Sequence, residues 1–207
     1  MMIHPDFEVA LARERASTLW RRAALAGLAR QARAAGGTPA SRPVRLRDGS
    51  RVLIRPVRAG DAALLAEGFA RLSERSRQLR FLGRKNTLTA SDLRYYTDVD
   101  HHDHEALGAL DHVRGGGVGI ARYVRDREDP RAAEIAVTIV DDWQGRGLGV
   151  KLLDRLSDRA REEGIGRFTA LVAADNVAVI GLLRHFRAEL TGRERGTAEY
   201  EIALNRR

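Results

Sequence analysis

A short segment with three glycines has the residue types and spacing of a phosphate-binding loop. It reads Gln144-Gly145-Arg146-Gly147-Leu148-Gly149 and lies between an apolar run typical of a strand and an amphipathic run typical of a helix. Glycine lets the backbone bend sharply, and the N–H groups at a helix start attract anions. Arg146 adds a positive charge. The pattern predicts a diphosphate site, although a tight turn that binds nothing can contain the same glycines.

Two familiar phosphate-binding motifs do not match this loop. The chain contains no Gly-x-x-x-x-Gly-Lys followed by Ser or Thr, so it is not expected to be a P-loop NTPase. Residues 145–149 do not read Gly-x-Gly-x-x-Gly either, and no acidic residue about 20 positions further on ends a second strand, as a Rossmann fold requires. The loop therefore favours a different diphosphate ligand.

One carboxylate interrupts the apolar strand that leads to the loop. Glu134 is flanked by apolar residues, which are Ala132, Ala133, Ile135, Ala136 and Val137. Partial burial would raise the pKa of its carboxyl group and make Glu134 a better general base near neutral pH. The alternative is a strand-end carboxylate paired with a neighbouring arginine.

The elements that must position these residues follow from periodicity and turn signals. Alternation and turn residues predict a hairpin over 44–55, strands over 105–110, 118–124, 133–140 and 168–173, and a final hairpin over 188–204. Helical periodicity predicts helices over 62–72, 74–83, a short stretch around 91–96, 150–163 and 177–186. Asp61 is a candidate N-cap, and Gly164 a candidate left-handed helix end. This order predicts an α/β fold with a mixed sheet in a single domain.

The first 43 residues differ in texture from the rest of the chain. Residues 1–37 predict one helix with a shallow, alanine-rich apolar stripe, and residues 38–43 predict a linker to the domain over 44–207. Such a stripe needs a partner surface, either on the same domain or on a second copy. The N-terminal helix is therefore a candidate homodimer contact.

Composition narrows the function classes. The chain has 207 residues and no cysteine, which excludes disulfides, thiolate zinc sites and a cysteine nucleophile. No apolar run reaches the ~18 residues of a membrane span, and no signal-peptide core is present, so a cytoplasmic protein without a membrane partner is expected. The net charge is +8, but acidic residues lie among the basic ones, so no nucleic-acid partner is expected.

Two further features need an interpretation. The run His101-His102-Asp103-His104 contains metal-ligating residue types, but adjacent residues on a strand point to opposite faces, so a polar loop is favoured and no metal is expected. Trp143, directly before the glycine loop, is interpreted as a packing residue in preference to a stacking platform.

At the glycine loop the sequence resembles the GNAT superfamily of acyl-CoA N-acyltransferases, whose signature is Gln/Arg-x-x-Gly-x-Gly/Ala. The resemblance covers roughly residues 44–204 and implies a single domain with a mixed, largely antiparallel sheet flanked by helices. It also implies acetyl-CoA as acyl donor. The residues that would contact acetyl-CoA are Val137, Thr138 and Ile139 along the pantetheine arm, Gln144, Gly145, Arg146, Gly147, Leu148 and Gly149 around the pyrophosphate, and Asn176 at the start of the next helix.

Three further segments resemble the bacterial protein-lysine acetyltransferases of the Pat type. They are Ile54-Arg55-Pro56-Val57, residues 71–81 and Leu182-Leu183-Arg184. This resemblance implies a protein lysine as acceptor and Glu134 as general base. A small-molecule amine or amino acid as acceptor, or a non-catalytic acyl-CoA sensor, remain the alternatives. Many family members carry a tyrosine acid seven residues after the asparagine, where this chain has Leu183, so no general acid is assigned.

Overall fold

The computed structural model describes residues 43–204. The helix predicted over residues 1–37, and with it the candidate dimer contact, lies outside the described residues. Within the described range, eight strands form one sheet in the order β1-β2-β3-β4-β5-β6-β8-β7. The strands are β1 Val44–Arg45, β2 Arg51–Pro56, β3 His104–Asp111, β4 Gly117–Arg125, β5 Ala132–Ile139, β6 Arg167–Ala173, β7 Glu189–Glu194 and β8 Thr197–Ala203.

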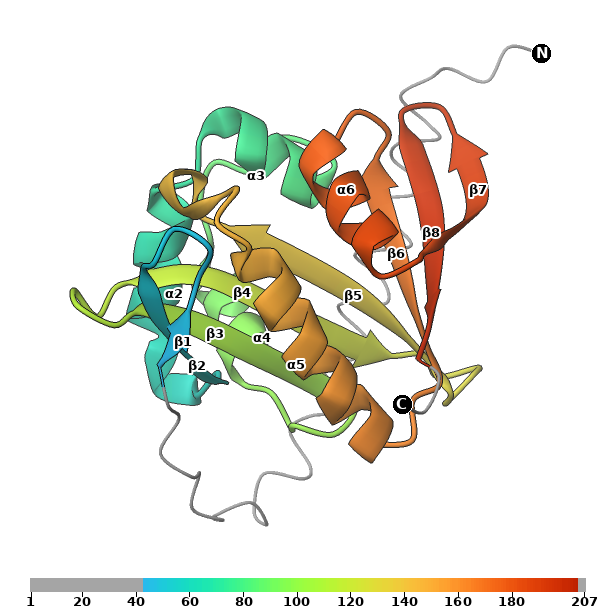
Figure 1. The fold of residues 1–207 in the computed structure, drawn as a ribbon, viewed down its shortest axis with the longest axis horizontal. Coiled ribbons are helices and arrows are strands. Elements are labelled where there is room, and N and C mark those ends of the chain that lie inside the picture. The colour runs from blue at the N-terminus through green and yellow to red at the C-terminus, as the bar shows by residue number, and fades with distance from the viewer. Residues whose placement is uncertain (1–42, 205–207) are drawn as a thin grey trace.

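Helices cover both faces of this sheet. They are α2 Ala62–Ala70, α3 Glu74–Phe81, α4 Ala90–Thr97, α5 Leu148–Glu162 and α6 Val177–His185, with short 3₁₀ turns η1 Ala59–Asp61 and η2 Asp141–Trp143. Figure 1 shows α5 in front of the sheet and α4 behind it. The alternation of each strand explains this arrangement, because successive side chains point to opposite faces. The predicted α/β fold with a mixed sheet is confirmed.

The main core lies between the sheet and α5. Tyr123 of β4, Phe168 of β6 and the helix residues Leu152, Leu153 and Leu156 are fully buried there. Burying one such side chain contributes roughly 1.5–3 kcal/mol before the loss of chain entropy. This packing holds α5, and so the loop that precedes it, rigidly against the sheet.

Strands β5 and β6 pair only at their starts. The pair is parallel and covers Ala132–Glu134 of β5 against Arg167–Thr169 of β6. Beyond Glu134, β5 stays paired with β4, while β6 stays paired with β8 along its length. The two halves of the sheet therefore separate after Glu134, and Figure 1 shows α6 on the β6 side of this opening and the glycine loop on the β5 side.

The structure changes some details of the predicted elements. The helix predicted over 74–83 ends at Phe81, because Leu82 takes a left-handed backbone with φ 50°. The helix predicted over 62–72 ends at Ala70. Asp61 stands at the N-cap position of α2 but does not cap it, because its carboxylate accepts hydrogen bonds from the Arg55 guanidinium at 2.6 and 2.7 Å.

Candidate active site

A cleft of about 380 Å³ opens where the sheet separates. Its walls come from α3, the end of β5, the glycine loop, the start of α5 and α6. Arg47, Arg80 and His185 are its basic lining residues, and among the described residues that line it there is no Asp or Glu. A cleft with cations and no carboxylates is electrostatically suited to an anionic ligand.

The β5 edge offers backbone groups to this cleft. The N–H of Val140 donates to the carbonyl oxygen of Val118 on β4 at 3.1 Å. In an antiparallel pair the direction alternates, so the backbone of Thr138 also faces β4 while Val137 and Ile139 turn their N–H and C=O groups toward the open side. The Thr138 side chain lies on the face of the sheet opposite to the side chains of Val137 and Ile139, and its hydroxyl accepts a 3.1 Å hydrogen bond from Arg80 Nε.

The glycine loop has the conformation that its residues predict. Gly145 and Gly147 have φ values of 73° and 85°, in the left-handed region that side chains other than glycine rarely adopt. Helix α5 begins at Leu148, and no side chain of the described residues caps its N-terminus. The first N–H groups of an α-helix have no partner within the helix, so these groups remain available to an anion in the cleft.

Arg146 does not supply the positive charge of the cleft. Its guanidinium stacks on the Trp143 ring at 4.7 Å and donates to Asp48 at 2.9 Å and to the carbonyl of Asp142. The side chain that lies across the loop is Arg47, whose Nε would be 3.2 Å from a Cβ at Gly147. The sequence gives no local signal for Arg47, because the β1–β2 hairpin is about a hundred residues away along the chain.

Gln144 and Asn176 hold the two sides of the cleft in shape. Gln144 Nε2 donates to the carbonyl oxygen of Ile139 at 3.1 Å, which ties the loop to the strand end. Asn176 is buried and its side-chain oxygen accepts from the N–H of Val179 at 3.2 Å, which caps α6. Both residues line the cleft, so Asn176 also orients the helix that faces the glycine loop.

Glu134 lies at the point where β5 and β6 separate. It is half-buried and lines a small cavity together with Val137, Asn176 and Leu183. Loss of solvation raises the pKa of Glu134 to about 7, and the positive charge of Arg80 opposes this rise. Among residues 43–204 the Glu134 carboxylate forms no ion pair, so the arrangement differs from a strand-end carboxylate paired with an arginine.

The sequence profile of the Acetyltransferase (GNAT) family matches residues 74–186, more than half of the chain. The chain belongs to the GNAT acetyltransferase family. It is thus an acyltransferase enzyme that uses acetyl-CoA. It is 38% identical over 136 residues to an acetyltransferase of Pseudomonas aeruginosa, covering 65% of this chain and 73% of that protein.

Other relatives place the chain near the Pat proteins within GNAT. It is 33% identical over 178 residues to Acetyltransferase Pat of Mycolicibacterium smegmatis, covering 86% of this chain but only 53% of that longer protein. The crystal structure of the GNAT domain of S. lividans PAT superposes with a TM-score of 0.75 at 29% identity, covering 81% of this chain and 99% of that domain.

One position of this GNAT site lacks a proton donor. Leu183, which stands seven residues after Asn176, is 1% exposed and faces the cavity that holds Glu134. An aliphatic side chain cannot protonate a leaving thiolate. The leucine that replaces the tyrosine found in many GNAT enzymes therefore lines the same cavity as Glu134.

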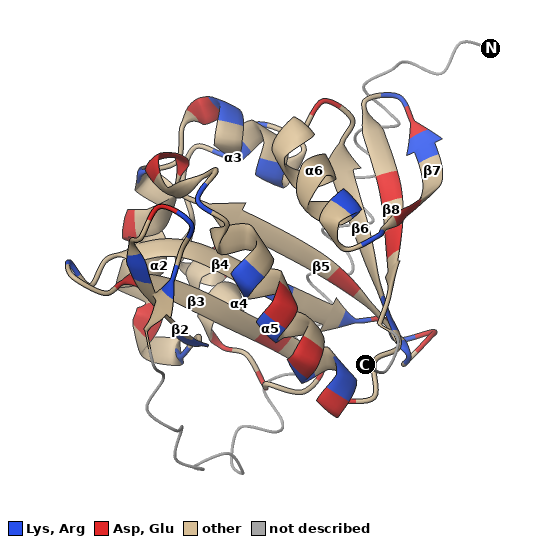
Figure 2. Ribbon diagram, viewed as in Figure 1, with Lys and Arg blue, Asp and Glu red and all other residues tan. Residues whose placement is uncertain are grey.

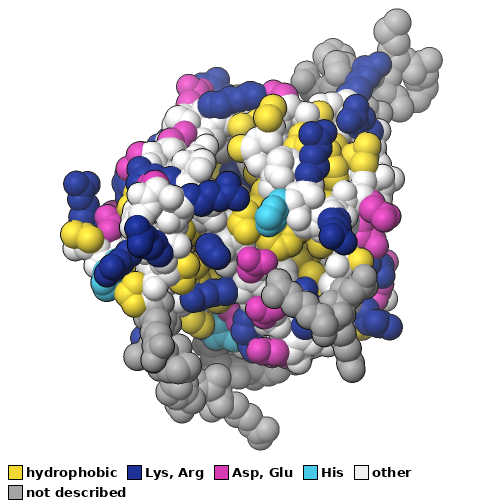
Figure 3. All heavy atoms as spheres, in the orientation of Figure 1, with side chains coloured by type: hydrophobic (Ala, Val, Ile, Leu, Met, Phe, Trp, Pro, Cys, Tyr) yellow, Lys and Arg dark blue, Asp and Glu magenta, His cyan; other side chains and the backbone are white. Residues whose placement is uncertain are grey.

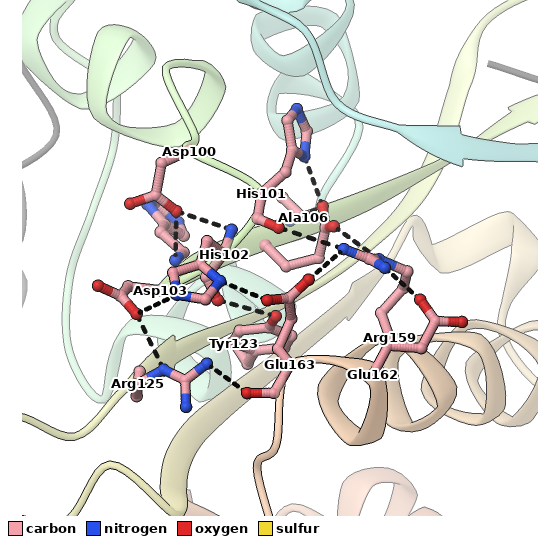
Figure 4. A network of polar contacts seen from close by, with 12 residues as sticks. Asp100, His101, His102, Asp103, Ala106, Tyr123, Arg125, Arg159, Glu162 and Glu163 are labelled. Atoms are coloured by element: carbon pink, nitrogen blue, oxygen red, sulfur yellow. Dashed lines mark hydrogen bonds and ion pairs between the residues drawn. The ribbon is translucent and has the colours of Figure 1, made fainter. Parts of the chain in front are cut away.

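The histidine run is part of a structural network in this GNAT domain. His101 Nδ1 lies 2.8 Å from Glu105 Oε1, Arg159 Nε lies 3.3 Å from Glu105 Oε2, and His102 Nδ1 contacts Glu163 (Figure 4). These contacts join β3 to the C-terminal end of α5. In the described part of the chain no group of three or more His, Cys, Asp or Glu side chains is arranged to hold a metal ion.

Charges on the surface are mixed, as the sequence predicts. Figure 2 shows Lys and Arg interspersed with Asp and Glu on α3, α5 and the β7–β8 hairpin. Figure 3 shows the same mixture on the face that carries α5, with hydrophobic side chains visible between the charged ones. Trp143 is 8% exposed and belongs to the main core, which agrees with its interpretation as a packing residue.

Proposed function

We propose that the protein transfers the acetyl group of acetyl-CoA to the side-chain amine of a protein lysine, with Glu134 as general base. The observation that carries this proposal is the position of Glu134. It stands where the two strands separate, beside the cleft, in a cavity that raises the pKa of its carboxyl group to about 7. A carboxylate with that pKa is a stronger base than an ordinary carboxylate and can take a proton from an ammonium group near neutral pH.

The cleft is proposed as the acetyl-CoA site. The uncapped start of α5 and the exposed N–H groups of the loop suit the pyrophosphate, and Arg47 adds a cation beside Gly147. Val137 and Ile139 offer backbone donors and acceptors that match the amides of the pantetheine arm. Asn176 lines the opposite wall. This arrangement brings the thioester to the part of β5 that precedes the loop, next to Glu134.

The reaction follows from these positions. Glu134 takes a proton from the lysine ammonium, and the neutral amine attacks the thioester carbonyl carbon. A backbone N–H in Val137–Ile139 stabilises the oxyanion of the tetrahedral intermediate. The attacking nitrogen then loses its second proton to water, the intermediate collapses, the C–S bond breaks and CoA leaves as the thiolate. A thiol has a pKa of about 8.5, so the thiolate can leave without the acid that Leu183 does not provide.

Protein lysine is proposed as the acceptor because of the Pat-like segments. Residues 54–57 include the end of β2, residues 71–81 run from the end of α2 through α3, which contacts β5, and residues 182–184 lie in α6. A free amino acid or another small amine is the alternative acceptor, and a non-catalytic acyl-CoA sensor is the alternative to an enzyme of this kind.

We further propose that the protein acts in the cytoplasm, with the predicted helix over residues 1–37 as a contact between two copies. No helix within residues 43–204 is long and apolar enough to cross a membrane.

A labelled acetyl donor tests the acceptor. A cell lysate is incubated with the protein and isotopically labelled acetyl-CoA, and mass spectrometry follows label in proteins and in small amines. Label on lysine side chains supports the proposal, whereas label confined to small amines supports the alternative acceptor. The matched control is Glu134→Gln, which keeps the shape of the side chain but cannot accept the proton. If acetyl-CoA binds and neither protein labels any amine, the proposed function is wrong.

A further inference from the structure

Within residues 43–204, Arg122 of β4 is a buried positive charge without a negative partner. Its side chain is 2% exposed. Its Nη2 donates to the carbonyl of Tyr96 at 3.1 Å, its Nη1 lies 3.2 Å from His104 Nε2, and the guanidinium stacks over the Tyr96 ring at 4.4 Å. Burial holds the pKa of His104 well below its usual range, so this imidazole is neutral. All the partners of Arg122 within residues 43–204 are therefore uncharged.

Two other charges in or near the core are neutralised. Glu105 is 1% exposed and contacts both Arg159 and His101. Arg55 is partly buried and forms a two-point ion pair with Asp61. A buried charge that stays unpaired costs several kcal/mol. Burial lowers the pKa of Arg122 to about 10, which still leaves the guanidinium charged at neutral pH. Arg122 therefore differs from Glu105 and Arg55, each of which has a partner of opposite charge.

Arg122 also lines a cavity. The cavity has a volume of about 100 Å³ and lies between α2, α4 and the sheet. Most of its lining is apolar, with Leu65, Phe69 and Ile120 among the residues that contribute. One water-sized group needs ~10–15 Å³ of such a cavity, so the cavity has room for several of them. Asp61 is the one carboxylate among the described residues that line the cavity, and it is already paired with Arg55.

The cavity adjoins the proposed reaction centre. Arg80 and Thr138 line both this cavity and the acetyl-CoA cleft. The register pairs Arg122 with Ala136 and Val124 with Glu134, so Arg122 and Glu134 are diagonal neighbours on one face of the sheet. Diagonal neighbours lie ~7–8 Å apart. A group that fills the cavity can thus belong to a molecule that reacts beside Glu134.

We propose that this cavity binds a carboxylate carried by one of the two reactants, with the Arg122 guanidinium as its partner. The proposal rests on the proposed acyl transfer at Glu134, and it implies that the site accepts, besides acetyl-CoA and protein lysine, a donor or an acceptor that carries a carboxylate. Arginine binds carboxylates through two parallel hydrogen bonds, and such bonds are strong where water is excluded. The apolar walls accommodate the few methylene or methyl groups that separate the carboxylate from the reacting atoms.

The carboxylate has two chemical sources. It can end the acyl chain of a dicarboxylic acyl-CoA, or it can belong to an acceptor of the amino acid type. In both cases the new amide bond joins the acceptor nitrogen to the acyl carbon, and the C–S bond breaks. Of the two protons that the ammonium nitrogen loses, one goes to Glu134 and the other to water, and CoA leaves as the thiolate. The carboxylate itself takes no part in the bond changes and only positions its reactant.

Matched pairs of reactants separate these sources. The donor arm compares succinyl-CoA with butyryl-CoA on one lysine peptide, and the acceptor arm compares free amino acids with their amides using acetyl-CoA. In one arm the kcat/KM for the carboxylate-bearing reactant should exceed that for its neutral match by about 10- to 100-fold. In Arg122→Gln this ratio should fall to about 1. Arg155→Gln is the control, because Arg155 also donates to a backbone carbonyl but lies outside the cavity, and it should keep the ratio.

If none of these reactant pairs reacts, that result counts against the proposed function but not against carboxylate binding at Arg122. A binding measurement then tests the carboxylate site by itself. Thermal unfolding is followed with succinate and with free amino acids, each compared with its neutral amide. The carboxylate should raise the Tm of the wild type and of Arg155→Gln more than the amide does, but not that of Arg122→Gln. The inference would be overturned if the wild type showed the same kcat/KM and the same Tm shift for carboxylates as for their neutral matches. It would also be overturned if folded Arg122→Gln kept a preference for the carboxylates.

Discussion

The two ends of strand β5 differ in which parts of the chain give them their chemical properties. At the C-terminal end the loop over 144–149 uses its own backbone, because glycine conformation and a helix start expose N–H groups to the cleft. At the N-terminal end Glu134 depends on its surroundings, because burial raises its pKa and Arg80 from α3 opposes that rise. The comparison shows that donor binding can be encoded locally, whereas the base is tuned by residues from distant segments.

The largest effect is expected from Glu134→Gln. The amide cannot accept the proton of the acceptor ammonium, so kcat should fall by about 10²- to 10⁴-fold. The KM for acetyl-CoA should change little, because the loop end of β5 is intact. Steady-state kinetics of CoA release measure both constants. A large rise in the KM for acetyl-CoA with little loss of kcat would show that the two ends are not separate.

Gly147→Ala should impair acetyl-CoA binding more than turnover, which is the reverse of the effect expected for Glu134→Gln. Gly147 has a φ of 85°, and an added Cβ would lie 3.2 Å from Arg47 Nε. A left-handed alanine costs roughly 1–2 kcal/mol, and the shifted loop should raise the KM for acetyl-CoA by about tenfold with a smaller change in kcat. Gly164→Ala is a control with a positive φ at the other end of α5, where no cleft residue lies. It should lower the Tm without changing the KM.

Arg47 and Arg146 provide a matched test of the cation. Arg47→Ala should raise the KM for acetyl-CoA by about 3- to 10-fold, as expected for the loss of one charge-assisted hydrogen bond. Arg146→Ala should change this KM less, because Arg146 is bound to Asp48 and Trp143. A truncated acetyl thioester without phosphates serves as the control donor, and neither substitution should affect its KM. Equal effects of the two substitutions on acetyl-CoA would contradict the assignment of Arg47.

The smallest effect expected of a substitution is a shift in the pH dependence of the reaction. Glu134 must be ionised to act as base, so kcat/KM should rise tenfold per pH unit up to about 7 and then level. The positive charge of Arg80 lowers the pKa of Glu134, so Arg80→Gln should move this limb to higher pH while Arg80→Lys should restore much of it. The pH dependence of kcat/KM measures the shift. A limb that stays in place in Arg80→Gln would mean that burial alone sets the pKa.

The same raised pKa has a consequence for stability. The folded carboxyl group of Glu134 binds its proton more tightly than the unfolded one, whose pKa is near 4.5. Unfolding therefore releases a proton between pH 4.5 and 7, and the contribution of Glu134 to the free energy of unfolding declines as pH rises through that range. An ionised, half-buried base thus costs stability at the pH where it works.

The sequence by itself determined the order of the elements, the glycine loop and the family. Each of these depends on local properties, which are hydrophobic periodicity, turn residues and the conformational freedom of glycine at Gly145 and Gly147. The carboxylate within an apolar strand was also visible, because its neighbours along the chain are all apolar.

Only the tertiary structure decided which side chains meet. Arg146 is adjacent to the glycines in sequence but is turned away by Asp48 and Trp143, while Arg47 reaches the cleft from the β1–β2 hairpin. The burial of Arg122 and its contact with Tyr96 follow from the packing of α4 on the sheet. Side-chain direction and charge pairing are set by contacts between distant segments, and these contacts leave no local pattern in the sequence.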